Sequence, residues 1–192
     1  AGRGAGTADA ADGGEGLDVG KELKSLLGTS YWENTEAWKR AFEAGEMEEV
    51  LEQFEALAAA APNDVQAQMD LANAYMAWLQ MDNSKWQLSM KADEQFDKVL
   101  AIDGQHWEAR FTKAMSYTFW PDFLGKKKDA IQHFETLIAQ QETQPVADHH
   151  AQTYLFLGNL LQERDPERAR EIWQQGARRH PTNADLRDKL RN

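Results

Sequence analysis

A small residue followed four positions later by a large aromatic residue recurs four times along this chain. The pairs are Val50 and Phe54, Ala92 and Phe96, Ala130 and Phe134, and Ala169 and Trp173. Their first members are spaced 42, 38 and 39 residues apart, and residues four apart lie on one face of a helix. Such a period is typical of stacked helical hairpins, each of which buries its apolar face against a neighbour. The pattern therefore predicts an all-α protein built as a solenoid.

Composition shifts and turn residues divide the chain into a leader and one repeat domain. Residues 1–16 contain no large apolar side chain, so we expect a flexible linker there. We expect residues 17–192 to form a single domain. It should begin with an amphipathic helix that ends at Gly28 and covers the open end of the stack. The hairpins are expected at residues 31–64, 65–106, 107–146 and 147–183, with a capping helix at 184–191.

Several helices have recognisable start signals. Ser30 and Glu33 fit a capping box, in which a hydroxyl caps the helix and a carboxylate reaches back, so the first hairpin is expected to begin at Ser30. Ser84 and Gln87 form a second such box. Further starts are indicated by the N-cap residues Asp64, Asp165 (followed by Pro166) and Asn183.

Charge and composition exclude several classes of function. The net charge is −11, which disfavours nucleic-acid binding because phosphate contact needs a basic face. The chain has no cysteine, so disulfides and thiolate zinc sites are excluded. No apolar run approaches the roughly 18 residues that a membrane span needs, and we expect no direct insertion of this segment into a membrane.

Common motifs for catalysis or cofactor binding are absent from the sequence. The sequence contains no G-x-S-x-G, phosphate-binding loop, Rossmann glycine set or H-E-x-x-H. His149 and His150 are adjacent, so they are expected to point in different directions and not to share a metal ion. The remaining histidines are isolated in the sequence. We therefore expect no enzyme activity, no cofactor and no metal site.

The repeated motif halves resemble the tetratricopeptide repeat family over about residues 30–183. The first-helix half of the family motif is matched by Leu71-Ala72 with Tyr75, Ala114 with Tyr117, and Tyr154 with Leu157-Gly158. The second half is matched by Phe54 with Pro62 and by Ala169-Trp173 with Pro181. The resemblance implies a right-handed superhelix of antiparallel hairpins that binds other proteins without catalysis. For bacterial members it suggests assembly or maturation in the cell envelope, in the periplasm or tethered to a membrane rather than in the cytoplasm.

In this family the first helices of the hairpins line a concave groove, which we take as the expected binding site for a peptide or helix. The groove positions here are Met69, Asn73, Met76, Phe111, Met115, Leu155, Asn159 and Gln162. Methionine suits an adaptable apolar surface, and the two asparagines would hold polar or backbone groups of the partner. The lysines with which chaperone-binding members clamp a terminal carboxylate are missing. As an alternative occupant, the N-terminal helix would fold into the groove as an internal ligand.

The second and third repeats exceed the usual 34 residues by about eight and about four. Both additions fall between the two helices of a hairpin, on one edge of the stack, and they are expected to pack on each other. They carry the aromatic residues Trp78, Trp86, Phe119, Trp120 and Phe123. Trp86, Trp120 and Phe123 thus form a possible second binding edge. Two alternative functions follow, self-association through this edge and binding of a small apolar molecule in the groove.

Overall fold

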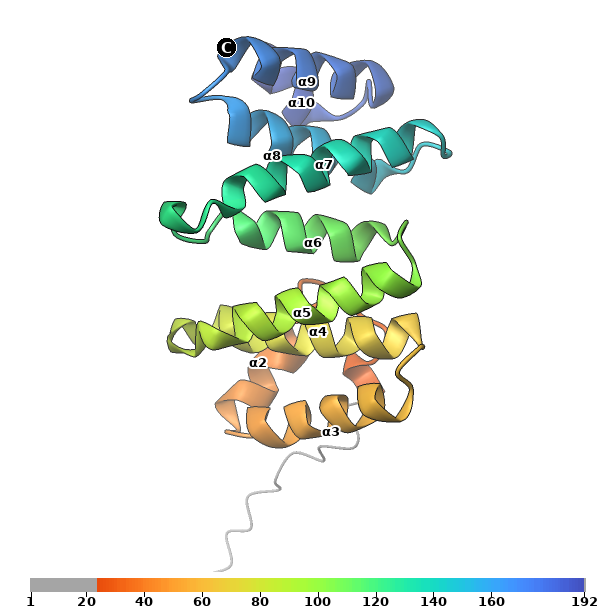
Figure 1. Cartoon of the computed structure of the whole chain (residues 1–192), viewed down its shortest axis with the longest axis vertical. Coiled ribbons are helices and arrows are strands. Elements are labelled where there is room, and N and C mark those ends of the chain that lie inside the picture. Colours follow the sequence, from red (N-terminus) through yellow and green to blue (C-terminus); the bar gives the residue numbers. More distant parts are fainter. Residues whose placement is uncertain (1–23, 192) are drawn as a thin grey trace, which may run out of the picture.

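The computed structural model describes residues 24–191, and 77% of these residues are helical, with no strand among them. Figure 1 shows the helices stacked one above another along the long axis. The linker predicted at residues 1–16 lies outside the described residues, as does most of the helix predicted before Gly28. The predicted all-α solenoid is therefore confirmed for the part of the chain that is described.

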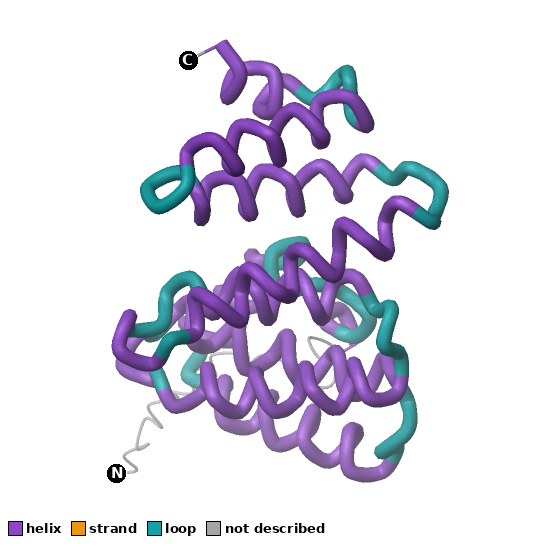
Figure 2. The backbone as a smooth tube through the Cα atoms, turned by 45° about the horizontal axis from the view of Figure 1, so that its top comes forward, coloured by secondary structure: helices purple, strands orange, loops and turns teal. Residues whose placement is uncertain are grey.

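The helices follow one another with short connections. They are α2 (Thr35–Glu43), α3 (Met47–Ala60), α4 (Val65–Met81), α5 (Gln87–Ile102), α6 (Trp107–Tyr117), α7 (Lys126–Glu142), α8 (Ala151–Leu161), α9 (Pro166–Arg179) and α10 (Ala184–Arg191), with 3₁₀ turns η1 (Asn83–Lys85), η2 (Asp122–Leu124) and η3 (Asp148–His150). The pairs α4–α5, α6–α7 and α8–α9 pack as antiparallel hairpins in a right-handed superhelix, and α10 packs on α9. The tube in Figure 2 shows how loops join these helices at the two edges of the stack.

The four small–aromatic pairs lie in the buried core of the stack. All eight side chains expose 6% or less of their surface, and Phe134 and Ala130 expose none. The fourth repeat shows why one position must be small. A Cβ atom at Gly158 would lie 2.1 Å from the indole Nε1 of Trp173, so α8 and α9 approach closely only because position 158 has no side chain.

Three of the predicted caps are present. The side chain of Asp64 accepts a hydrogen bond from the N–H of Ala67 at 2.8 Å, at the start of α4. At the start of α9, Asp165 accepts from the N–H of Arg168 at 3.0 Å, with Pro166 in the first turn. Asn183 likewise accepts from the N–H of Leu186 at 3.0 Å.

The first hairpin begins later than the capping box predicted, because α2 starts at Thr35. Half of the box is formed, since the Ser30 N–H donates to Glu33 Oε2 at 3.0 Å. The other half is absent because the Ser30 hydroxyl donates to the Glu108 carboxylate of α6 instead. Residues 30–33 therefore form a turn rather than the first turn of the helix.

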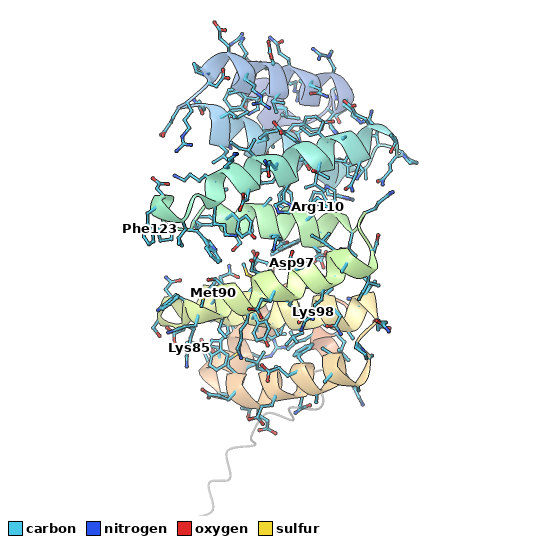
Figure 3. The ribbon with its side chains drawn as sticks, in the orientation of Figure 1. Lys85, Met90, Asp97, Lys98, Arg110 and Phe123 are labelled. Atoms are coloured by element: carbon cyan, nitrogen blue, oxygen red, sulfur yellow. The ribbon has the colours of Figure 1, made fainter. Side chains whose placement is uncertain are left out.

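Two apolar clusters make up the core, and they meet at α6. One cluster runs from Leu26 to Ala109 and the other from Phe111 to Leu186. At this junction Lys113 of α6 is only 3% exposed. Its Nζ lies 2.6 Å from Asp93 Oδ1 and 2.9 Å from Asp97 Oδ1, both on α5. Figure 3 labels Asp97 on α5, on the side next to α6.

Candidate interaction surface

The eight predicted groove residues, which we call the groove face, divide into a covered part and an open part. Met69, Asn73 and Met76 of α4 and Phe111 of α6 form the covered part and expose 1%, 2%, 8% and 4%. The two methionines belong to the first core cluster and Phe111 to the second. Their apolar side chains were expected to turn outward and owe nothing to the core, and the structure instead places them within it.

The open part lies farther along the stack. Met115 of α6 and Leu155 of α8 are half-buried, whereas Asn159 of α8 and Gln162 just after the end of α8 are exposed. The open part of the groove face therefore presents two amide side chains beside partly exposed apolar ones. Sequence reasoning did not identify Phe156, also half-buried on α8, whose ring packs edge-on against Phe111 at 5.3 Å.

The chain's own N-terminal segment contacts this covered part at Asn73. Residues 28–31, which we call the strap, cross α4 and reach α6 before α2 begins. The Gly28 N–H donates to Asp70 Oδ1 at 3.0 Å, and Gly28 has the left-handed φ of +70° that favours glycine. In Figure 1 this N-terminal part of the coloured ribbon passes behind α4 and α5.

Asn73 holds the strap backbone on both sides of Ser30. Its Oδ1 accepts from the Tyr31 N–H, and its Nδ2 donates to the Thr29 carbonyl, each at 3.4 Å. The role expected for Asn73, gripping a peptide backbone, is thus performed on an internal segment. This matches the alternative in which the chain's own N-terminal segment occupies the groove, although a turn rather than a helix is the occupant.

Two strap side chains are also bound. The Ser30 hydroxyl donates to Glu108 at the start of α6, and Ser30 is only 7% exposed. Tyr31 is 8% exposed and belongs to the first core cluster. Burial, together with the charge of Glu108, raises the pKa of Tyr31 to about 12. The phenol therefore stays neutral in its apolar site throughout the physiological range.

The carboxylates beneath the strap are in poorly solvated positions. Burial raises the pKa of Asp70 above its usual value, although hydrogen bonds from Gln66 and Gly28 partly oppose this shift. Burial likewise raises the pKa of Glu108, against the opposing hydrogen bond from Ser30. Burial makes the ionised form of both carboxyl groups less favourable, and the hydrogen bonds that the strap donates reduce this penalty.

Two shallow cavities border the open part of the groove face. One, of about 230 Å³, includes Asn159 and lies between the ends of α6, α7 and α8; its lining is Thr118, Lys127, Ile131, Asn159, Leu160, Glu163 and Arg164. The other, of about 410 Å³, includes Gln162 and is lined by Gln162, Pro166, Glu167, Arg170, Trp173 and Lys189. Each mixes acidic, basic and apolar side chains, which suits a peptide better than a small apolar molecule.

The predicted aromatic edge is only partly packed. Trp120 contacts Tyr117 at a ring distance of 5.6 Å and lies beneath the Lys126 ammonium. Trp86, by contrast, is 59% exposed and Phe123 is 86% exposed. The two additions were predicted to pack on each other. Among the described residues, however, the rings of Trp86 and Phe123 make no contact. Figure 3 shows Phe123 and Met90 near the same edge of the stack.

Histidine geometry differs from expectation. The rings of His149 and His150 lie in η3 with their centroids 4.6 Å apart, rather than pointing away from each other. Both rings also approach Trp107. Within residues 24–191 no group of three His, Asp or Glu side chains is arranged to hold a metal ion. Over the same range, no helix has the length and apolar character to cross a membrane.

Solved structures of several repeat proteins share this architecture. TTC0263 of Thermus thermophilus, described as a thermophilic TPR protein, superposes with a TM-score of 0.58 at 16% identity, covering 88% of this chain and 79% of that one. TPR denotes the tetratricopeptide repeat. The chain has the tetratricopeptide-repeat fold.

Two other structures agree with this assignment. MamA of Desulfovibrio magneticus RS-1 gives a TM-score of 0.56 at 20% identity and covers 90% of this chain and 82% of its own. The kinesin light chain TPR-like repeats of Podospora anserina give 0.58 at 19% identity, covering 88% and 83%. The TM-scores of these three superpositions show a common tetratricopeptide-repeat fold. No protein-family model and no curated protein sequence matches the chain.

A pH dependence of stability follows from His150, which is 4% exposed. Burial, with the neighbouring His149, His180 and Arg179, lowers the pKa of His150 to about 4. Because its folded-state pKa lies below the unfolded value of about 6.5, its contribution is complete above pH 6.5. We expect this contribution, about 2–3 kcal/mol, to be lost as the pH falls from 6.5 towards 4.

The raised pKa values of Asp70 and Glu108 act in the opposite direction, so the matched variant is essential to this measurement. His150→Asn removes the titrating ring and retains an acceptor near the position of Nδ1, which accepts from Ala147 N–H. Urea denaturation of both proteins between pH 4 and 8 should show the wild type losing more stability on acidification. Parallel pH profiles would mean that His150 is not the group responsible.

Proposed function

We propose that this protein is a non-catalytic scaffold that binds a peptide or helix of another protein on its groove face. One observation carries the proposal. The first helices α4 and α6 already hold a peptide segment, the strap, through Asp70 and Asn73 of α4 and Glu108 of α6. Solved proteins that share the fold are repeat proteins, and tetratricopeptide-repeat proteins of this kind typically act as scaffolds.

We place the site for the partner on the open part of the groove face. There, Asn159 and Gln162 offer amide donors and acceptors, while Met115 and Leu155 offer partly exposed apolar surface. Side chains of this kind bind a helix or extended segment by combining apolar anchors with a few polar contacts. Methionine adds the ability to repack around segments of different shape.

Replacing both exposed amides, in the variant Asn159→Ala/Gln162→Ala, should weaken partner capture about tenfold, which corresponds to about 1.4 kcal/mol. Stability should change by less than about 0.5 kcal/mol because exposed side chains contribute little to folding. The measurement is capture of the partner from an extract of the source organism, quantified by mass spectrometry, together with thermal unfolding of each variant.

The matched control is Gln132→Ala, an exposed amide on α7, which is a second helix of its hairpin and does not line the groove face. It should leave capture unchanged. If both variants capture the partner as well as the wild type does, the open part of the groove face is not the site.

The resemblance to bacterial repeat proteins suggests cell-envelope assembly or maturation as the setting for such a scaffold. A second candidate function is self-association through the aromatic edge. It is favoured by one observation, the exposure of Phe119 and Phe123 at 80% and 86% on the loop that contains η2. Binding of a small apolar ligand has weaker support, because charged side chains line each cavity: Arg170 in the larger one and Arg164 in the smaller one.

A further inference from the structure

The strap has the features of a bound ligand rather than of a structural cap. A cap that closes the end of a solenoid core is expected to be held by apolar contacts. The strap is held chiefly by polar groups, because Asp70 and Asn73 contact its backbone and Glu108 contacts its Ser30 hydroxyl. Within residues 28–31 Tyr31 is the one large apolar anchor, and Leu26 just before the strap is also buried in the first core cluster.

Polar contacts of this kind are exchangeable. When a backbone N–H leaves a carboxylate or carboxamide, both groups regain hydrogen bonds to water, so the net loss is small. Asp70 and Glu108 would also regain solvation that burial now denies them. Release of the strap therefore frees the polar groups Asp70 and Asn73 on α4 and Glu108 on α6, and vacates the place that Tyr31 occupies in the first core cluster.

The contacts also specify what can bind in its place. Asn73 pairs with one N–H and one carbonyl that flank a single residue, a pattern that any non-helical backbone can supply. Glu108 selects a donor side chain at the central position, as Ser30 provides. The Tyr31 pocket selects an aromatic residue immediately after it.

We propose that the surface of α4 and α6 formed by Asp70, Asn73 and Glu108 is a second peptide site, occupied in the resting protein by the strap. Its external ligand is a non-helical segment in which a hydroxyl residue precedes an aromatic residue, carried by the partner protein. This deepens and rests on the proposed scaffold function. A tethered segment competes at high effective concentration, so the strap excludes weak ligands and admits those that also bind the open part.

The proposal is tested with a fluorescein-labelled peptide of sequence LLGTSYWEN, the same as residues 26–34. In the full-length chain, Ser30→Ala/Tyr31→Ser loosens the strap and should increase peptide affinity at least tenfold over the wild type, measured by fluorescence anisotropy. Adding Asn73→Ala to this variant should abolish the gain. A peptide with alanine in place of its serine and tyrosine should not bind. If the loosened variant binds no better than the wild type, the proposal is overturned.

A measurement on the wild type covers the case in which the loosened variant does not fold. Hydrogen exchange should show the amides of Gly28 and Tyr31 opening at a much lower free energy than the amides of Met76 and its neighbours in α4. If all of them exchange only through global unfolding, the strap is fixed structure and the second site does not exist. Neither assay needs the natural partner, so failure here leaves the open part of the groove face as an independent proposal.

Discussion

Replacing Phe134 by alanine is expected to lower the free energy of unfolding by about 3–5 kcal/mol, the usual cost of truncating a buried aromatic residue. Phe134 is fully buried on α7, where its ring meets Phe111 edge-on at 5.8 Å and Phe156 at 6.2 Å. Truncation leaves a cavity between the third and fourth hairpins, because these three rings come from different helices and cannot all move inward. Urea denaturation with far-UV circular dichroism measures the loss.

Two matched variants show whether burial is the cause. Phe134→Leu keeps most of the volume and should cost less than about 1.5 kcal/mol. Gln132→Ala, two residues away on the exposed side of the same helix, should change stability by less than about 0.5 kcal/mol. A neutral Phe134→Ala would mean that the small–aromatic pairs do not mark the buried face, and the repeat assignment would lose its main support.

Replacing Lys113 by methionine should destabilise the protein by about 3 kcal/mol, although methionine fills nearly the same space. The Lys113 ammonium is buried between Asp93 and Asp97, and removing it leaves the Asp93 carboxylate without its cation. The Asp93 side chain is only 18% exposed, whereas that of Asp97 is 64% exposed. Most of the cost therefore comes from Asp93, because breaking a buried pair from one side strands a charge.

A double-mutant cycle isolates this effect. Asp93→Asn removes the negative charge while keeping a side-chain acceptor for the Tyr117 hydroxyl, which interacts with Asp93 and whose pKa is raised by burial and by this neighbour. In the Asp93→Asn background, Lys113→Met should cost about 2 kcal/mol less than in the wild type. Equal costs in both backgrounds would show that Lys113 contributes by packing along α6 and not through its charge.

Much of the buried core of this fold could be predicted from the sequence. Pairs such as Ala130 and Phe134 specify which helical face is buried, since both residues are fully buried in the structure. The Asp165-Pro166 start of α9 could be predicted because its cap is local, formed between residues three apart. Features that depend on neighbours along the chain were thus accessible to sequence reasoning.

Features that depend on residues far apart in the chain were not. The Ser30 hydroxyl is 78 residues from its acceptor Glu108, so a capping box was the reasonable local interpretation. Lys113 sits opposite Asp93 and Asp97, whose spacing of four places them on one face of α5. The spacing of the two aspartates could have indicated a site for a basic side chain. Which helix supplies that side chain depends on how the helices stack, which the sequence alone does not show.

The groove residues show the same division. Helical periodicity placed Met69, Met76 and Phe111 on first helices but could not show that their side chains are buried in the core. Asn159 and Gln162 are exposed because no segment in the described part of the chain covers α8 there. The candidate site was therefore predicted by position, while its division into covered and open parts came from tertiary structure.

The most direct test of the scaffold account is site-specific photo-crosslinking in cells of the source organism. A photoreactive phenylalanine is placed in the full-length chain at Asn159 on the groove face, at Gln132 on α7 or at Phe123 on the aromatic edge. The account predicts that one partner protein is cross-linked from position 159, through a defined peptide, and not from position 132. Cross-links from position 123 to other copies of this chain, with none from position 159, would contradict it and favour self-association.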